Sequence, residues 1–100
     1  MKLNELNKQR ENYQIKGNIL KEIEVLREIL TETEKEYSSE SDEYIKALNE
    51  LGGTLKYVGY YDEAESNLKK SLEIINNKYG DNNLAYATSL LNLTEVYRFA

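Results

Sequence analysis

The chain has 100 residues, a net charge of −5 at pH 7 and 31% charged residues, and it contains no Cys, His, Trp or Pro. This length allows one small domain, and the lack of cysteine excludes a disulfide framework and thiol chemistry. The charges are interspersed, with no basic stripe and no long apolar run, so we expect neither nucleic-acid binding nor a membrane span. We therefore expect a cytoplasmic protein.

The first segment, residues 2–16, has apolar residues at helical spacing, interrupted by Arg10. Gly17 predicts a turn, because glycine leaves a helix at little steric cost. The alternative is one long helix through Gly17, which costs roughly 1 kcal/mol relative to alanine. Residues 18–36 predict a strongly amphipathic helix, whose apolar stripe contains Ile19, Ile23, Leu26 and Leu30.

The next predicted helix, residues 43–58, follows a serine-rich loop at 38–42 that offers candidate N-caps. It contains two adjacent glycines, Gly52 and Gly53, which together cost of order 1–2 kcal/mol inside a helix. We expect the close approach of a second helix to compensate at Gly52. Gly59 is predicted to end the helix.

Two further helices follow. The fourth has acidic residues in its first turn, and it is predicted to end at Gly80 after Lys78. Residues 81–83 predict a cap for the last helix, whose stripe is Ala87, Leu90, Leu93, Val96 or Tyr97, and Ala100.

The chain matches itself when it is shifted by 42 residues. Gly59 then falls on Gly17, Tyr79 falls on Tyr37, and apolar positions of the helices fall on one another. Helical periodicity alone would not align the glycines. A fixed period in this range indicates an array of stacked helical units.

Residues 44–80 resemble a tetratricopeptide repeat, and the 42-residue period resembles the kinesin-light-chain type. The resemblance implies an all-α fold of antiparallel helix–turn–helix repeats stacked as an α-solenoid, with about five helices. It implies a degenerate first repeat at 2–37, a complete repeat at 43–80, and the first helix of a third, truncated repeat at 83–100. It also implies close contact between Gly52 and Ala64. The matching segments are Leu51-Gly52, Gly59-Tyr60-Tyr61-Asp62-Glu63-Ala64-Glu65, Ser71-Leu72-Glu73-Ile74 and Tyr79-Gly80.

The first repeat departs from this family at two facing positions. Arg10 and Glu22 stand where Gly52 and Ala64 stand in the second repeat. We predict that they form an ion pair, which would contribute of order 1 kcal/mol or less if partly exposed. The alternative is that a terminal repeat is simply atypical.

The last helix is expected to lack a covering partner. It is either a natural cap or, as we expect, the chain is a fragment of a longer array. Leu90, Leu93, Tyr97 and Phe99 would then offer apolar surface. Such a surface favours homo-oligomers or helix exchange between copies.

No catalytic motif, metal site or cofactor site is present in the sequence, so we expect no enzyme. The resemblance implies a concave groove lined by the first helix of each repeat, and a scaffold that binds a protein or peptide. The alternatives are a peptide-sensing regulatory domain and a purely structural module, and any single groove position could instead be an ordinary polar helix face. The implied groove residues, with Phe99 at their edge, are Asn7, Glu11, Lys46, Asn49, Glu50, Gly53, Lys56, Tyr57, Asn92, Glu95 and Arg98.

Overall fold

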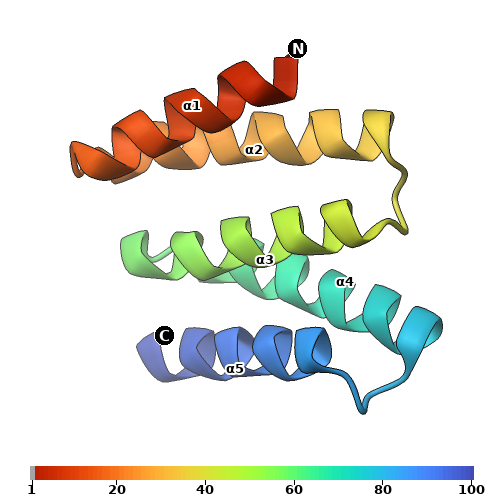
Figure 1. Cartoon of the computed structure of the whole chain (residues 1–100). Coiled ribbons are helices and arrows are strands. Elements are labelled where there is room, and N and C mark those ends of the chain that lie inside the picture. The colour runs from red at the N-terminus through yellow and green to blue at the C-terminus, as the bar shows by residue number, and fades with distance from the viewer. Residues whose placement is uncertain (1) are drawn as a thin grey trace. The chain divides into compact units, whose positions relative to one another are not determined.

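The computed structural model describes residues 2–100, which form five α-helices and one short 3₁₀ helix (Figure 1). The all-α class and the number of helices are confirmed. The chain divides into two compact units, Met1–Ala47 and Leu48–Ala100, with the boundary inside the third α-helix. The elements are α1 (Lys2–Ile15), α2 (Ile19–Glu36), α3 (Asp42–Leu55), η1 (Lys56–Val58), α4 (Tyr61–Tyr79) and α5 (Leu84–Phe99).

In the first unit, α1 and α2 form an antiparallel hairpin (Figure 1). Lys2 at the start of α1 pairs with Glu32 near the end of α2, at 3.2 Å from Nζ to Oε1. Arg10 pairs with Glu22 at the other end of the hairpin, at 3.1 Å from Nε to Oε2, as the sequence predicted. Glu22 is only 6% exposed, so this pair is more buried than we expected.

In the second unit, the expected close approach at Gly52 is confirmed, and the residue nearest to it is Leu68. A Cβ added to Gly52 would lie 2.7 Å from Cγ of Leu68 on α4, and its three nearest atoms all belong to Leu68. The reason is that helical side chains lean towards the N-terminus of their helix, so Leu68 covers the preceding turn. Gly52 therefore makes room for a leucine.

The turns that close the two hairpins share their hydrogen bonds. After α1, the N–H of Asn18 donates to the carbonyl of Tyr13 at 2.9 Å, and Gly17 has φ +72°. After η1, the N–H of Tyr60 donates to the carbonyl of Leu55 at 3.2 Å, and Gly59 has φ +81°. Both are the glycine-dependent helix ending in which a 6→1 bond satisfies a terminal carbonyl. The predicted breaks at both glycines are thus confirmed, although η1 rather than regular α-helix spans residues 56–58.

The loops that follow α2 and α4 also correspond. Ser38 has φ +136° where Gly80, 42 residues later, has φ +82°. Ser41 Oγ then accepts the N–H of Tyr44 at 3.1 Å, and Asn83 Oδ1 accepts the N–H of Ala85 at 2.8 Å. The expected caps of α3 and α5 are therefore present.

Helix α5 packs against α4 in the second unit (Figure 1). The hydroxyl groups of Ser71 on α4 and Ser89 on α5 lie 2.9 Å apart, and both residues are fully buried. Leu93 lies one turn from Ser89 on the same side and is buried, so the expectation that it offers open apolar surface was wrong. Leu90 is 46% exposed, whereas Leu48, its counterpart 42 residues earlier, is fully buried.

Candidate functional site

The candidate site is a face of the second unit on which α3 and η1 meet α5. A Cβ at Gly53 would lie 3.6 Å from Nδ2 of Asn92, Lys56 pairs with Glu95, and the ring of Tyr57 meets that of Phe99. These contacts occur in the same order along both segments, so the segments run side by side and parallel. We define the α3–α5 face as Asn49, Gly53, Lys56, Tyr57, Asn92, Glu95 and Phe99.

Lys56 is the most enclosed charge on this face. Its side chain is 4% exposed, and Nζ donates a hydrogen bond to the carboxylate of Glu95. The same Nζ lies 5.0 Å from the ring centroid of Tyr57 and 5.7 Å from that of Phe99, within cation–π range. Lys56 is thus held inside the face, with its charge already neutralised.

The aromatic residues of the face form a pair. The ring centroids of Tyr57 and Phe99 are 5.8 Å apart with an interplanar angle of 74°, an edge-to-face arrangement. Both side chains are exposed. They therefore offer apolar contact area beside the buried cation.

The hydrogen bond from Lys56 lowers the pKa of the Glu95 carboxyl below its ordinary value of 4.5. The positive charges of Lys56 and, to a smaller extent, Arg98 lower it further, while partial desolvation acts in the opposite direction. Glu95 therefore carries its negative charge throughout the neutral range.

Asn49 provides an unsatisfied hydrogen-bonding group. Among the described residues, its Oδ1 is buried and has no hydrogen-bond partner. Such groups are rare in folded proteins because each loses its hydration without replacement. The oxygen can accept an N–H, and an asparagine amide also donates, so the side chain suits a peptide backbone.

The remaining predicted groove residues lie in both units. Glu50 and Arg98 belong to the second unit, and Arg98 acts on Glu95 through its charge. Asn7, Glu11 and Lys46 are exposed and belong to the first unit. Their role in binding stays a prediction.

Two polar features of α4 were not found from the sequence. The Tyr97 hydroxyl donates to the carboxylate of Glu65, which lowers the pKa of Glu65 and raises that of Tyr97. Asn67 has a buried Nδ2 that, within residues 2–100, finds no acceptor. Helical spacing in the sequence predicts neither the Tyr97–Glu65 bond nor the buried Asn67 amide, because both depend on which residues of a neighbouring helix face α4.

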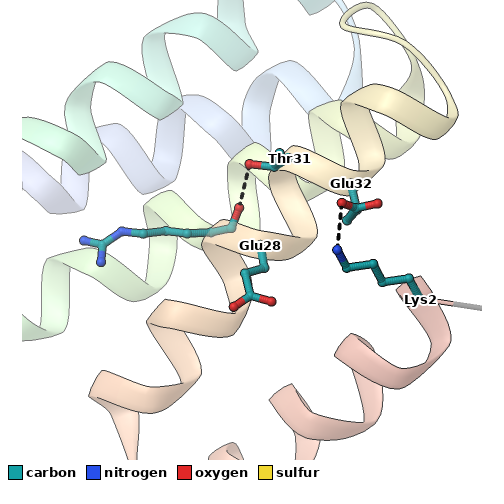
Figure 2. A pocket seen from close by; sticks show the side chains of 5 residues that line it. Lys2, Glu28, Thr31 and Glu32 are labelled. Atoms are coloured by element: carbon teal, nitrogen blue, oxygen red, sulfur yellow. Dashed lines mark hydrogen bonds and ion pairs between the residues drawn. The ribbon is translucent and has the colours of Figure 1, made fainter.

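A separate depression of about 330 Å³ lies on the first unit (Figure 2). It contains two cations and two anions, and the figure shows Lys2 directed at Glu32. Thr31 uses its hydroxyl to bond the carbonyl of Arg27 at 3.2 Å. The depression thus surrounds the Lys2–Glu32 ion pair, which joins α1 to α2. None of the predicted groove residues lines it. Its lining is Lys2, Arg27, Glu28, Thr31 and Glu32.

No His, Cys, Asp and Glu cluster suited to a metal ion occurs between residues 2 and 100. Over the same residues, no helix combines the length and the apolar character needed to cross a membrane.

The hairpins and their recurring turns define a helical-repeat protein. The model of the tetratricopeptide repeat family matches residues 43–100, and the chain belongs to this family. No curated protein matches the chain.

Proposed function

We propose that the chain is a protein-interaction module that holds a peptide segment against the α3–α5 face. The observation that carries the proposal is the buried, unpartnered Oδ1 of Asn49 on a face that also contains the Asn92 amide. Asn49 is itself partly exposed, so a rotation of its amide would bring this oxygen to a bound backbone N–H, which would satisfy it. Membership of the tetratricopeptide family supports protein binding in general. In this proposal the repeats are of the kinesin-light-chain type, span 2–37, 43–80 and 83–100, and act in the cytoplasm.

The chemistry of the face favours a particular kind of peptide contact. Gly53 has no side chain, and the Asn92 amide beside it is within ordinary van der Waals distance of the position that a Cβ would take. The Asn92 amide is therefore the polar group that the face presents next to Gly53. Because Glu95 neutralises Lys56, the centre of the face selects by backbone hydrogen bonds rather than by charge. Tyr57 and Phe99 add an anchor for one apolar side chain.

The test is a selection of peptides from a displayed random library on the wild-type chain, followed by affinity measurement on variants. We expect Asn49→Glu and Asn92→Glu each to weaken the selected peptides at least about tenfold, because each adds bulk and charge to the face. Asn77→Glu, an exposed change on α4, is the matched control. Equal affinity in all four proteins, with helical content unchanged by circular dichroism, would refute the proposal.

A second proposal, which rests on α5, is that copies of the chain associate through this helix. Leu84, Leu90, Leu91 and Tyr97 are all exposed on it, and the intervening exposed positions carry no charge. Light scattering over a range of concentrations tests this: Leu90→Glu should shift the mass towards the monomer. The regulatory and purely structural alternatives gain no support from any contact described above.

A further inference from the structure

We infer that α5 pairs with α5 of a second copy, and that the two helices lie antiparallel across a two-fold axis beside Leu91. This pairing rests on the proposed association of copies through α5, and it adds the direction of the helices and the residues that meet. The surface that carries it, the α5 seam, shares no residue with the α3–α5 face. The members of the α5 seam are Leu84, Ala87, Leu91, Thr94 and Arg98.

The α5 seam has the spacing of a helix that packs against another helix. Its residues are separated by alternating steps of three and four, the heptad pattern that forms one narrow stripe on a helix. All of them are exposed, and Leu84 and Leu91 are 83% and 59% exposed. From Asn82 to Thr94 the chain has no charged residue, although 31% of all its residues are charged. The stripe is therefore open to solvent and uncharged over most of its length.

The hydroxyl groups along this stripe already have hydrogen bonds. The hydroxyl of Thr94 donates to the carbonyl of Leu90 at 2.9 Å. The hydroxyl of Thr88, which lies beside the seam, donates to the carbonyl of Leu84 at 3.0 Å. Neither group needs water or a hydrogen bond from another helix, so a neighbour can exclude water here without leaving an unpaired donor.

The leucines of the seam depart from the pattern of the repeats. At the positions 42 residues earlier, Asp42 stands for Leu84 and Asn49 stands for Leu91, and Asn7 is the equivalent residue of the first repeat. Asn49 lies on the side of α3 that meets α5, so a helix stacked in the same way on α5 would lie over leucine instead of a polar residue. The seam of α5 is therefore suited to a neighbour that presents apolar residues of its own.

The seam is complementary to its own reverse. In an antiparallel contact centred on Leu91, the small side chain of Ala87 meets the partner's Thr94, which is also small. The long side chains of Leu84 and Arg98 meet at each end of the seam. The small pairs allow the helix axes to approach to about 8–10 Å. Such a two-fold contact is closed, since each seam covers its own equivalent and leaves no open surface.

The charges at the two ends of α5 favour the antiparallel direction. Asp81 precedes the helix and Arg98 is in its last turn, and both are exposed. In the antiparallel pair, the alkyl chain of Arg98 covers the partner's Leu84, and its guanidinium extends towards the partner's Asp81 about one turn further along. A parallel pair would instead place each charge beside its own equivalent. Glu95 also attracts Arg98, but its carboxylate already accepts a hydrogen bond from Lys56.

The charged ends give one test of the direction. The seam is about 21 Å long, a contact at the low end of interface sizes, so dimerisation is measured by analytical ultracentrifugation at high protein concentration. Arg98→Glu places like charges at both ends of the antiparallel pair, and we expect it to raise the dissociation constant at least about threefold. D81R/R98E restores both pairs and should bind as the wild type does. If Leu90→Glu abolished the dimer while Arg98→Glu had no effect, association through α5 would stand and the antiparallel register would be refuted.

The decisive experiment uses the fact that the chain contains no cysteine, so that an introduced thiol reports on one position. We expect Leu91→Cys to form a disulfide-linked dimer on mild oxidation, because it lies beside its own equivalent. Leu84→Cys, the matched control on the same seam, should not link to itself, since the two equivalents would be about 21 Å apart. An equimolar mixture of Leu84→Cys and Arg98→Cys should link. The inference is overturned if Leu84→Cys alone links as fast as Leu91→Cys, or if neither Leu91→Cys nor the mixture links.

Discussion

The hydroxyl groups of Ser71 and Ser89 form a hydrogen bond of 2.9 Å between α4 and α5, and neither side chain is accessible to solvent. The tetratricopeptide pattern that residues 44–80 resemble implies alanine at the position of Ser71. This bond therefore replaces an apolar contact with a polar one that needs both partners.

We expect Ser71→Ala to lower the free energy of unfolding by about 1–2 kcal/mol, because it leaves the Ser89 hydroxyl buried without a partner. The double variant S71A/S89A removes both groups and should return to within about 1 kcal/mol of the wild type. Urea denaturation of the wild type, Ser71→Ala, Ser89→Ala and S71A/S89A measures the coupling. Additive losses in the double variant would show that the bond contributes nothing.

The ion pair of Arg10 and Glu22 should likewise lose stability when one partner is removed and regain most of it when both are replaced. We expect Arg10→Met to cost about 2 kcal/mol, less than for a fully buried pair because the Arg10 side chain is 23% exposed. The variant R10M/E22L should recover most of this loss, since an apolar pair of similar size needs no desolvated charge. Lys21→Met, which breaks the exposed Lys21–Glu24 pair, is the control and should change stability little.

The adjacent glycines of α3 should respond in opposite directions to alanine. Gly53→Ala should stabilise the chain by about 0.5–1 kcal/mol, because its methyl group would make ordinary contact with Asn92 and alanine favours the helix. Gly52→Ala should destabilise it by about 1–2 kcal/mol, because the methyl group would lie 2.7 Å from Cγ of Leu68. Thermal and urea unfolding of both variants provide the comparison. If both substitutions changed the free energy of unfolding in the same direction, the packing described would be contradicted.

The loop serine at position 38 occupies a backbone conformation that favours glycine, with φ +136°. We expect Ser38→Gly to stabilise the chain by about 1 kcal/mol as this strain is removed. Gly80→Ser, at the equivalent position, should lose about 1–3 kcal/mol, because φ +82° with ψ −179° is a conformation essentially restricted to glycine, whereas an added Cβ there meets no atom within 4 Å. The two changes in unfolding midpoint should therefore have opposite signs.

Acid should weaken the α3–α5 face through Glu95. Its pKa in the folded chain is below the ordinary value of 4.5, so its contribution is present above that value and is lost as pH falls through the lowered pKa. We expect Glu95→Gln to flatten the decline of stability between about pH 5 and pH 2. Glu73→Gln controls for the loss of one negative charge. Parallel decline in wild type and Glu95→Gln would count against the Lys56 contact.

The helices and their ends were predictable because they depend on local chemistry. Gly17, Gly59 and Gly80 mark points where the backbone needs positive φ, and Asn83 caps α5 as expected. Ser38 was not predicted to share this conformation, since serine rarely adopts it. The alignment at 42 residues, which places Ser38 opposite Gly80, contained that information.

The site was less predictable because its contacts depend on side chains from different helices. Lys56 was predicted to line the groove, but Glu95 and two aromatic rings enclose it. The Ser71–Ser89 bond could not be inferred from the preceding repeat, where the aligned residues are Ile29 and Ala47. The Arg10–Glu22 pair was predictable, because opposite charges replaced small residues at positions that face each other.

The bonds Arg10–Glu22 and Ser71–Ser89 have a consequence for mutational tolerance. The family pattern implies glycine or alanine at the positions of Arg10 and Ser71. Either residue, introduced alone in this chain, would leave the buried partner, Glu22 or Ser89, without its hydrogen bond. A survey of single substitutions would therefore rank these positions as intolerant of the residue most common among related repeats. A survey of paired substitutions would find the same positions tolerant, because the partner residue on the other helix is then replaced at the same time.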